Sequence, residues 1–328
     1  MRVWAPIPRA AVFATDVTTG MYDTIAVVRG ASLLLSIVMG LVACRGAGET
    51  TSPEAVAPEP NLEHAFFDAQ GNPASLEQFA TDVADVDFIG FGEFHYHVVG
   101  SRVELELLQA LAAQERPVAL AMEFFEADTQ AALDDYLAGR IEEPEFRELT
   151  GRNDKYDDSH RPLIEFCKEH SIDVIAANAP RALVTGYRKS GMSYEEYLAS
   201  LSEEQRAQMP ATSVPPDDEF KRRFMDLMGP DRGPRFYKSM ALWNDAMAES
   251  VANYRVEHPE HRVLLVVGAF HVAGQLGTVT EYRARRPGDS TAVLTMIWQE
   301  QGPIVFADED RGEGDLVLKV PKPVSASK

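Results

Sequence analysis

The chain has 328 residues, of which 45% are hydrophobic and 25% are charged, and these fractions are typical of a globular protein rather than a collagen-like or disordered one. Its 51 acidic residues outnumber the 31 Lys and Arg residues, which gives a formal net charge of −20. Because nucleic-acid binding depends on basic contacts with phosphates, we expect no nucleic-acid partner.

The N-terminal region has the pattern of a bacterial lipoprotein signal. Residues 30–44 follow Arg29 and carry no charge, and this run is shorter than the roughly 20 apolar residues that a transmembrane helix needs. Residues 41–44 read Leu-Val-Ala-Cys and resemble a lipobox, whose cysteine becomes the lipid-modified first residue of the mature protein. We therefore expect a signal peptide over 1–43 and lipidation of Cys44. A cleaved signal without lipid and a chance hydrophobic run are the alternatives.

The segment after the lipobox is expected to tether a single folded domain to a membrane. Residues 44–60 are rich in Gly, Pro, Thr and Glu and have no periodic apolar face, which is typical of a flexible linker. The lipobox cysteine is followed by Arg45 and not by the aspartate that retains many lipoproteins in the inner membrane. The expected location is therefore the bacterial cell envelope, in the outer membrane. The folded domain is expected over 61–320, with a polar tail over 321–328.

Apolar runs separated by helical patterns predict an α/β fold. The runs consist largely of Val, Ile, Leu, Ala and Phe, as in parallel strands that are covered on both faces. The four predicted core strands are 86–91, 118–122, 172–177 and 263–267. We expect a mostly parallel central sheet with helices on both faces. Three later runs are expected to add strands at the sheet edge, at 293–297, 303–306 and 316–318.

The chain between the third and fourth predicted strands is much longer than a crossover connection requires. Such a connection takes about 10 to 12 residues. Residues 181–258 are instead a long segment that is helical in pattern and rich in charge, Met and Tyr. We expect a helical insertion here, which could cover a site as a lid.

Polar residues follow each of the four predicted core strands. In an open parallel sheet, ligands bind beyond the carboxyl ends of the strands, so these residues are candidates for a functional site. The first and fourth strands end in Gly-x-x-His motifs, at 92–95 and 268–271, in which the glycine permits a tight turn. The candidate site residues are Glu93, His95, Glu123, Asn178, Arg181 and His271.

The residue types in this set suit metal binding or acid–base chemistry. Imidazoles and carboxylates bind divalent or iron-type metals and also transfer protons. His95, Glu123 and His271 are the predicted metal ligands. Each of these residues, taken alone, has an explanation that needs no functional site. His95 could be a hydrogen-bonded loop residue, and Glu123 could be a carboxylate that the helix dipole favours at the start of a helix. The remaining histidines are expected at the surface, and they are His64, His160, His170, His258 and His261.

The order of these motifs resembles the ChaN-like haem-binding lipoproteins of the Tiki, TraB and erythromycin-esterase superfamily. The motifs are Gly-Glu-Phe-His at 92–95, Ala-Met-Glu-Phe-Phe at 121–125, Ile-Ala-Ala-Asn-Ala-Pro-Arg at 175–181, Asp-Ala-Met-Ala at 245–248 and Gly-Ala-Phe-His at 268–271. The likeness runs from about residue 86 to about residue 285. It implies a parallel-centred α/β fold and a site built on His95, Glu123 and His271.

The resemblance also implies haem or iron as the ligand, with a tyrosine on the iron in a homodimeric arrangement. One departure bears on the iron ligand. ChaN-like sequences usually continue the first motif with Asp-Asn-Pro and a further histidine, whereas residues 96–100 here read Tyr-His-Val-Val-Gly. The haem-ligand candidates are therefore Tyr96 and His97, and the tyrosines of the insertion are further candidates. The candidates among them are Tyr187, Tyr194 and Tyr237.

Three functional hypotheses follow from these observations. The leading one is a lipid-anchored envelope protein that binds haem or iron in a crevice at the strand ends and serves iron acquisition. The alternative is a metal-dependent hydrolase of the cell envelope, which would use the paired Gly-x-x-His motifs and the glutamates with Mn, Co or Zn. A third is a protein-interaction domain that has lost its site, and the intact polar strand ends speak against it.

Overall fold

The computed structural model of the chain describes residues 63–152 and 155–323. The predicted signal peptide, the Cys44 lipidation site and the tether over 44–60 lie outside the described residues. Within the described part, no helix combines the length and the apolar character that crossing a membrane requires.

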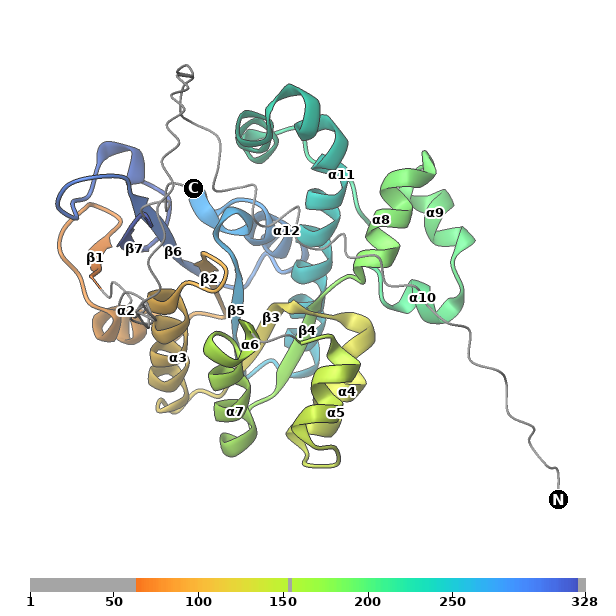
Figure 1. Ribbon diagram of the computed structural model, residues 1–328, viewed down its shortest axis with the longest axis horizontal. Helices are drawn as coiled ribbons and strands as arrows, with labels where there is room; N and C mark the ends of the chain where they lie inside the picture. Colours follow the sequence, from red (N-terminus) through yellow and green to blue (C-terminus); the bar gives the residue numbers. More distant parts are fainter. Residues whose placement is uncertain (1–62, 153–154, 324–328) are drawn as a thin grey trace, which may run out of the picture. The chain divides into compact units, whose positions relative to one another are not determined.

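A seven-stranded sheet forms the centre of the described residues (Figure 1), in the order β1-β7-β6-β2-β5-β3-β4. The strands are β1 (Ala65–Asp68), β2 (Phe88–Glu93), β3 (Val118–Glu126), β4 (Val174–Asn178), β5 (Arg262–Gly268), β6 (Thr291–Gln299) and β7 (Leu316–Pro321). Every neighbouring pair is parallel except β1 with β7, which is antiparallel. The prediction of an α/β fold with a mostly parallel central sheet is confirmed.

Helices cover the sheet on both faces. Those before β4 are α2 (Leu76–Asp82), α3 (Val98–Ala112), α4 (Gln130–Leu137), α5 (Glu143–Thr150), α6 (Lys155–Asp158) and α7 (Arg161–His170). One face of the core strands packs with α3, α4, α5 and α7 into a single apolar core that includes Phe91, Leu107 and Phe146. On the other face Phe88 of β2 stacks on Tyr282 of α12 (Thr278–Arg285), with ring centroids 4.5 Å apart. Because alternate residues of a strand point to opposite faces, the continuous apolar runs serve both layers.

The segment between β4 and β5 is mainly helical. It contains α8 (Arg181–Ser190), α9 (Tyr194–Ser200), α10 (Glu203–Ala207) and the long α11 (Glu219–Glu257). In Figure 1, α8, α9 and α10 form one group beside α11. Helix α11 is interrupted at Gly229, which has a left-handed φ of 75°. The next residue is Pro230. After this break its Met247 and Val251 are fully buried, so the helix covers the sheet through its apolar stripe.

The late strands differ from the expectation of added strands at the sheet edge. β6 and β7 lie inside the sheet, and the edge beyond them is β1, a four-residue strand that the sequence pattern does not indicate. Residues 303–306 form no strand. Pro303 has no backbone N–H to give to a sheet, and the Phe306 ring packs on Phe67 of β1, with centroids 5.7 Å apart. The apolar character of that run therefore reflects packing on the edge strand.

Candidate functional site

The four core strands are neighbours in the order β2, β5, β3, β4, so their carboxyl ends lie along one edge of the sheet. Glu93, Gly268 and Asn178 are the last residues of β2, β5 and β4. Glu123 lies inside β3, since that strand continues to Glu126. The pairing of β3 with β4 shifts register after Met122. Such an irregularity bends a strand and changes the direction of its side chains.

Glu93 contacts two histidines with its two carboxylate oxygens. Its Oε1 is 2.7 Å from Nδ1 of His95, and its Oε2 is 3.2 Å from Nε2 of His160. Burial raises the pKa of Glu93, but the two imidazoles, His160 foremost, outweigh this and hold it well below its usual value. For His95, burial lowers the pKa. The hydrogen bond to Glu93 and the charge of Glu123 outweigh burial, so the pKa of His95 lies above its ordinary value. Glu93 is thus a buried carboxylate between two imidazoles.

The expectation that His160 lies at the surface is wrong. Its exposed fraction is 2%, and its ring packs on Phe124 of β3 with centroids 3.8 Å apart. Phe124 also makes an edge contact with His95 at 5.1 Å. The buried position of His160 directly before α7 gives Glu93 its second imidazole partner.

A second carboxyl group faces Glu93 from helix α3. Glu104 is fully buried, with an exposed fraction of 0%, and neither of its carboxylate oxygens accepts a hydrogen bond from a donor group. Burial, together with the neighbouring charge of Glu93, raises the pKa of Glu104 well above its usual value. Ligand atoms of Glu93, Glu104 and His160 all lie within 4.8 Å of one another.

Glu123 is tied to the second Gly-x-x-His motif. Its Oε2 accepts a hydrogen bond from the backbone N–H of Gly268 at 2.7 Å, and its Oε1 is 3.7 Å from Nε2 of His271. His271 is buried, and its Nδ1 lies 2.5 Å from Oδ1 of Asn244 on α11. Because an amide oxygen only accepts, Nδ1 carries the proton and the neutral ring presents its Nε2 lone pair toward Glu123. Burial lowers the pKa of His271, which favours this neutral form.

Asn178 and Arg181 have separate surroundings. Asn178 is buried, and its Oδ1 has no hydrogen-bond partner. Arg181 begins α8, where its backbone N–H donates to Glu126 Oε2 at 3.0 Å and its Nε lies 3.7 Å from Glu126 Oε1. The end of β3 therefore fixes the start of α8.

Tyr96 and His97, the two haem-ligand candidates, differ in their positions. Tyr96 has a φ of 62°, a left-handed conformation that is rare for residues other than glycine, and 40% of it is exposed. Lys155 Nζ lies 4.8 Å from the centre of its ring. His97 instead caps α3, with Nδ1 accepting from Gly100 N–H at 3.4 Å, and its ring contacts Trp298. The imidazole of His97 therefore stabilises the start of α3 and packs on Trp298.

The three haem-ligand candidates in the insertion are packing residues. Their exposed fractions are 3% for Tyr187, 8% for Tyr194 and 5% for Tyr237. The hydroxyl groups of Tyr194 and Tyr237 donate to the backbone carbonyls of Pro210 and Pro216, each at 2.5 Å. A buried hydroxyl that is satisfied in this way fixes a loop.

The glycines of the two Gly-x-x-His motifs provide space and not a turn. Neither has a positive φ. A Cβ at Gly92 would lie 2.9 Å from the backbone Cα of Ala269, and one at Gly268 would lie 3.0 Å from Cε1 of His95 and 3.4 Å from Oε2 of Glu123. The absence of a side chain lets the polar groups of neighbouring strands approach one another.

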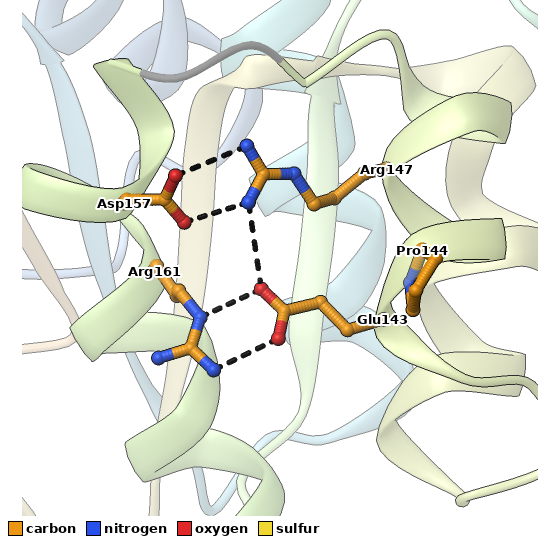
Figure 2. A pocket seen from close by; sticks show the side chains of 5 residues that line it. All are labelled: Glu143, Pro144, Arg147, Asp157 and Arg161. Atoms are coloured by element: carbon orange, nitrogen blue, oxygen red, sulfur yellow. Dashed lines mark hydrogen bonds and ion pairs between the residues drawn. The ribbon is translucent and has the colours of Figure 1, made fainter.

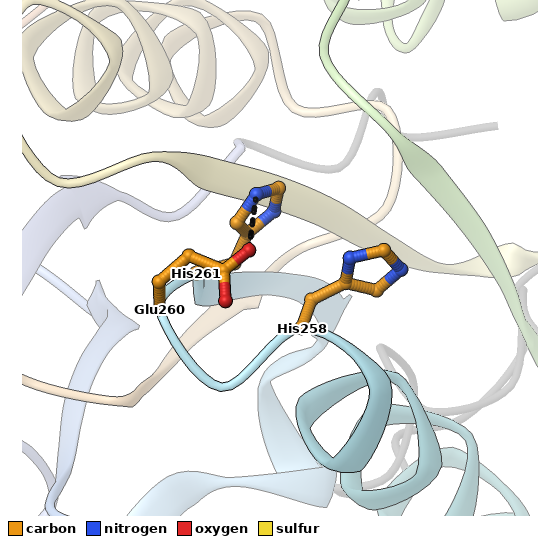
Figure 3. A group of neighbouring side chains, drawn as sticks. All are labelled: His258, Glu260 and His261. Carbon is orange, nitrogen blue, oxygen red and sulfur yellow. Dashed lines mark ion pairs between the residues drawn. The ribbon is translucent and has the colours of Figure 1, made fainter.

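Two groups of three potential metal ligands occur in the described part of the chain, and the predicted set of His95, Glu123 and His271 is not one of them. One is the buried group of Glu93, Glu104 and His160. The other, His258 with Glu260 and His261, lies at the opposite end of β5, where Figure 3 shows the carboxylate of Glu260 turned toward His261. His261 Nδ1 is already 2.7 Å from the hydroxyl of Tyr254, and Glu260 is exposed.

A pocket between α5 and α7 is lined by paired charges (Figure 2). Arg147 contacts Asp157 and Arg161 contacts Glu143, each at 2.6 Å. None of the strand-end residues lines it. Its side chains satisfy one another, so it offers no charge to a ligand.

Three residues of the site were missed by sequence reasoning. Glu104 had a detectable signal, because it interrupts the apolar stripe of α3 beside Leu107 and Leu108. Asn244 also had a signal, because it directly precedes the motif at 245–248. His160 had no detectable signal, since it stands in a polar segment with no periodic pattern.

Comparison with protein families identifies the class. The chain matches the family described as "Haem-binding uptake, Tiki superfamily, ChaN" over residues 79–281. The chain belongs to this family. No curated protein sequence matches it.

Several solved structures resemble the chain at low sequence identity. The structure described as cofacial haem binding to ChaN of Campylobacter jejuni matches with a TM-score of 0.58 and 17% identity, covering 79% of this chain and 98% of that one. An erythromycin esterase, EreC, matches with a TM-score of 0.45 and 12% identity, covering 72% and 77%. The type III effector HopBA1 matches with a TM-score of 0.44 and 12% identity, covering 82% and 100%. The first of these likenesses supports the fold assignment.

Proposed function

We propose that this protein binds haem in a crevice at the carboxyl ends of the strands, with Tyr96 as the iron ligand, and that it serves iron acquisition. Membership of the haem-binding uptake family supports the ligand. The observation that carries the proposal for the residue is the left-handed backbone of Tyr96, which holds a partly exposed phenol directly after the Glu93 and His95 pair. Strained residues persist where the surroundings determine them, and they gather at functional sites.

The surface around Tyr96 fits a flat, largely apolar ligand. Tyr96 and Val98 are both large side chains that are partly exposed, at 40% and 42%, on either side of half-buried His97. Phe124 lies behind Tyr96, with ring centroids 6.5 Å apart. A porphyrin would bury this apolar surface, and phenolate is a known protein ligand of ferric haem.

Basic residues near Tyr96 complement the charge of such a ligand. The overall charge of the protein is strongly negative. Near Tyr96, however, the positive charges of Arg152 and Arg181 interact electrostatically with the phenol, and Lys155 lies over the ring. Burial raises the pKa of Tyr96, while the two arginines lower it and so oppose that effect. The same positive charges would attract the two carboxylates of haem.

Titration of the purified protein with haemin tests this function. We expect a stoichiometric shift of the Soret band, and Tyr96→Phe should weaken binding about tenfold or more, equivalent to about 1.4 kcal/mol. Tyr254→Phe is the matched control, because its hydroxyl contacts Asp173 away from the strand ends. A protein that shows no stoichiometric shift contradicts haem binding, and equal affinities for the two variants would contradict the role of Tyr96.

We further propose that lipid on Cys44 anchors the protein in the outer membrane. The uncharged run over 30–44 and its lipobox-like end support this. Labelling of cells with a fatty-acid probe should mark the protein, and Cys44→Ser should abolish the label and release the protein from membranes. A wild-type protein that takes up no label contradicts the anchor.

A homodimer that forms with haem is also proposed. The name of the related Campylobacter jejuni structure describes cofacial haem binding, and the partly exposed Tyr96 and Val98 would be covered in such an arrangement. Gel filtration with and without haemin tests it. An unchanged elution volume for the haem-loaded protein contradicts it.

Metal-dependent hydrolysis is the second candidate function. One observation favours it: His271 presents its Nε2 toward Glu123 while Asn244 fixes the ring, which suits metal binding or proton transfer at that nitrogen. A panel of ester and peptide substrates with Mn, Co or Zn tests it. Activity that survives replacement of both His95 and His271 by alanine would exclude this mechanism.

A further inference from the structure

A fully buried pair of carboxyl groups lies beneath the strand ends, beside a buried imidazole. The exposed fractions are 2% for Glu93, 0% for Glu104 and 2% for His160. Their ligand atoms all lie within 4.8 Å of one another. They come from three separate elements, because Glu93 ends β2, Glu104 lies on α3 and His160 immediately precedes α7.

Glu104 supplies an independent indication that a ligand belongs here. Both of its oxygens are buried and accept no hydrogen bond from a donor group, although a buried carboxylate is costly unless it is paired. The nearby Glu93 cannot compensate the buried charge of Glu104, since Glu93 is itself negatively charged. Two carboxylates that face each other in the interior require either a shared proton or a cation.

We propose that Glu93, Glu104 and His160 bind a divalent transition-metal ion of the Zn²⁺ type. Two carboxylates and one neutral imidazole balance the charge of a divalent cation. Carboxylate oxygen and imidazole nitrogen are both ordinary zinc ligands. This site is distinct from the predicted ligand set of His95, Glu123 and His271, and it goes beyond haem binding at Tyr96.

The observed spacing suits such an ion. His160 Nε2 and Glu93 Oε2 are 3.2 Å apart. Two ligands that each lie roughly 2.1 Å from a tetrahedral zinc are separated by about 3.4 Å. Glu93 can give Oε2 to the metal and keep its other oxygen on His95, 2.7 Å away. The buried metal would thereby position His95 at the outer, partly exposed end of the site.

Metal analysis of the purified protein tests the proposal. After dialysis against metal-free buffer, we expect about one equivalent of zinc for each chain, and added ZnCl₂ should raise the Tm of chelator-stripped protein. Glu104→Gln should lower the zinc affinity at least tenfold, because an amide is a poor zinc ligand, while it keeps the shape of the side chain. His258→Ala, which alters the other histidine cluster at the opposite end of β5, should retain the metal.

The shared-proton alternative gives the opposite result. In that case stripped wild type shows no Tm increase with ZnCl₂, and with ZnCl₂ present Glu104→Gln is as stable as wild type or more so, because glutamine mimics the protonated acid. Either finding overturns the proposal. Loss of zinc in His258→Ala with retention in Glu104→Gln also overturns it. Haem binding is read separately from the Soret band, so failure at one site is distinguishable from failure at the other.

Discussion

The carboxylate of Glu123 accepts a hydrogen bond from the backbone N–H of Gly268 at 2.7 Å. This contact joins β3 to the end of β5, where the second Gly-x-x-His motif begins. It fixes Glu123 near His271 on one side and near His95 on the other, because both Glu123 and His95 border the space that a Gly268 side chain would fill. The glutamate and the two motifs therefore form one packed unit.

Alanine variants of the two motif glycines should lose stability according to the atoms that surround each glycine. Gly92→Ala places a Cβ 2.9 Å from backbone of Ala269, which cannot rotate away, whereas Gly268→Ala meets the His95 ring at 3.0 Å. We expect losses of about 1–3 kcal/mol in the free energy of unfolding for Gly268→Ala and at least as much for Gly92→Ala. Urea denaturation measures this, with Gly288→Ala, where a Cβ meets open space, as the control. Equal stabilities for all three variants would refute the packing argument.

Asn244 should stabilise the domain through His271. Its Oδ1 accepts from His271 Nδ1 at 2.5 Å and from Thr278 Oγ1 at 3.0 Å, and all three residues are buried. Asn244→Ala leaves two buried donors without an acceptor and should cost about 1–3 kcal/mol. Chemical denaturation provides the measurement, and Asn253→Ala, at an exposed position of the same helix, is the control. If both alanine variants lose the same stability, the buried hydrogen bonds contribute nothing measurable.

Tyr96→Gly should separate stability from ligand binding. Glycine adopts a φ of 62° freely, whereas a left-handed non-glycine residue stores about 1–3 kcal/mol of strain. The variant should therefore be at least as stable as wild type, since relief of strain offsets the extra entropy of the unfolded chain, yet it should lose haem affinity. Thermal unfolding and haemin titration of the same preparation check both parts. A large drop in Tm would show that the Tyr96 side chain has a structural role instead.

Glu281 should make stability depend on pH. Burial, together with the charge of Asp245, raises the pKa of Glu281 to about 7 from an ordinary value of 4.5. Because the folded state holds this proton more tightly than the unfolded state, its contribution is most favourable below about pH 4.5 and is lost as pH rises through about 7.

Glu281→Gln removes that titration. The variant and wild type should have similar Tm values near pH 4.5, and the variant should be the more stable at pH 8, by roughly 2–4 °C for each 1 kcal/mol. Differential scanning calorimetry across this pH range gives the answer. A constant difference between the two proteins at all pH values would disprove the assigned pKa.

The sheet was predictable because its strands are buried on both faces. Runs such as 263–267 are apolar throughout, as is typical of parallel strands that are covered on both faces. The edge strand β1 was not predictable from the sequence, since its residues are only half-buried. Its pairing with β7 also joins distant parts of the chain. The run at 303–306 shows the opposite error, in which an apolar segment packs through one ring without forming a strand.

The site was predictable only where a strand carries its residues to the sheet edge. Glu93, Glu123 and the His271 motif follow from strand positions. In the structure Glu123 contacts the His271 motif, and Glu93 contacts His95. Glu104 and His160 reach the same region from a helix and a loop, so their proximity depends on tertiary packing that periodicity does not encode. The conformation of Tyr96 is likewise a property of the folded backbone.

The resonance Raman spectrum of the haem-loaded protein tests the assignment of Tyr96 most directly. Vibrations of an iron-bound tyrosinate should be present in wild type and in Tyr254→Phe, and they should be absent from Tyr96→Phe. A haem complex without tyrosinate vibrations, or one whose spectrum is unchanged by Tyr96→Phe, would contradict the account.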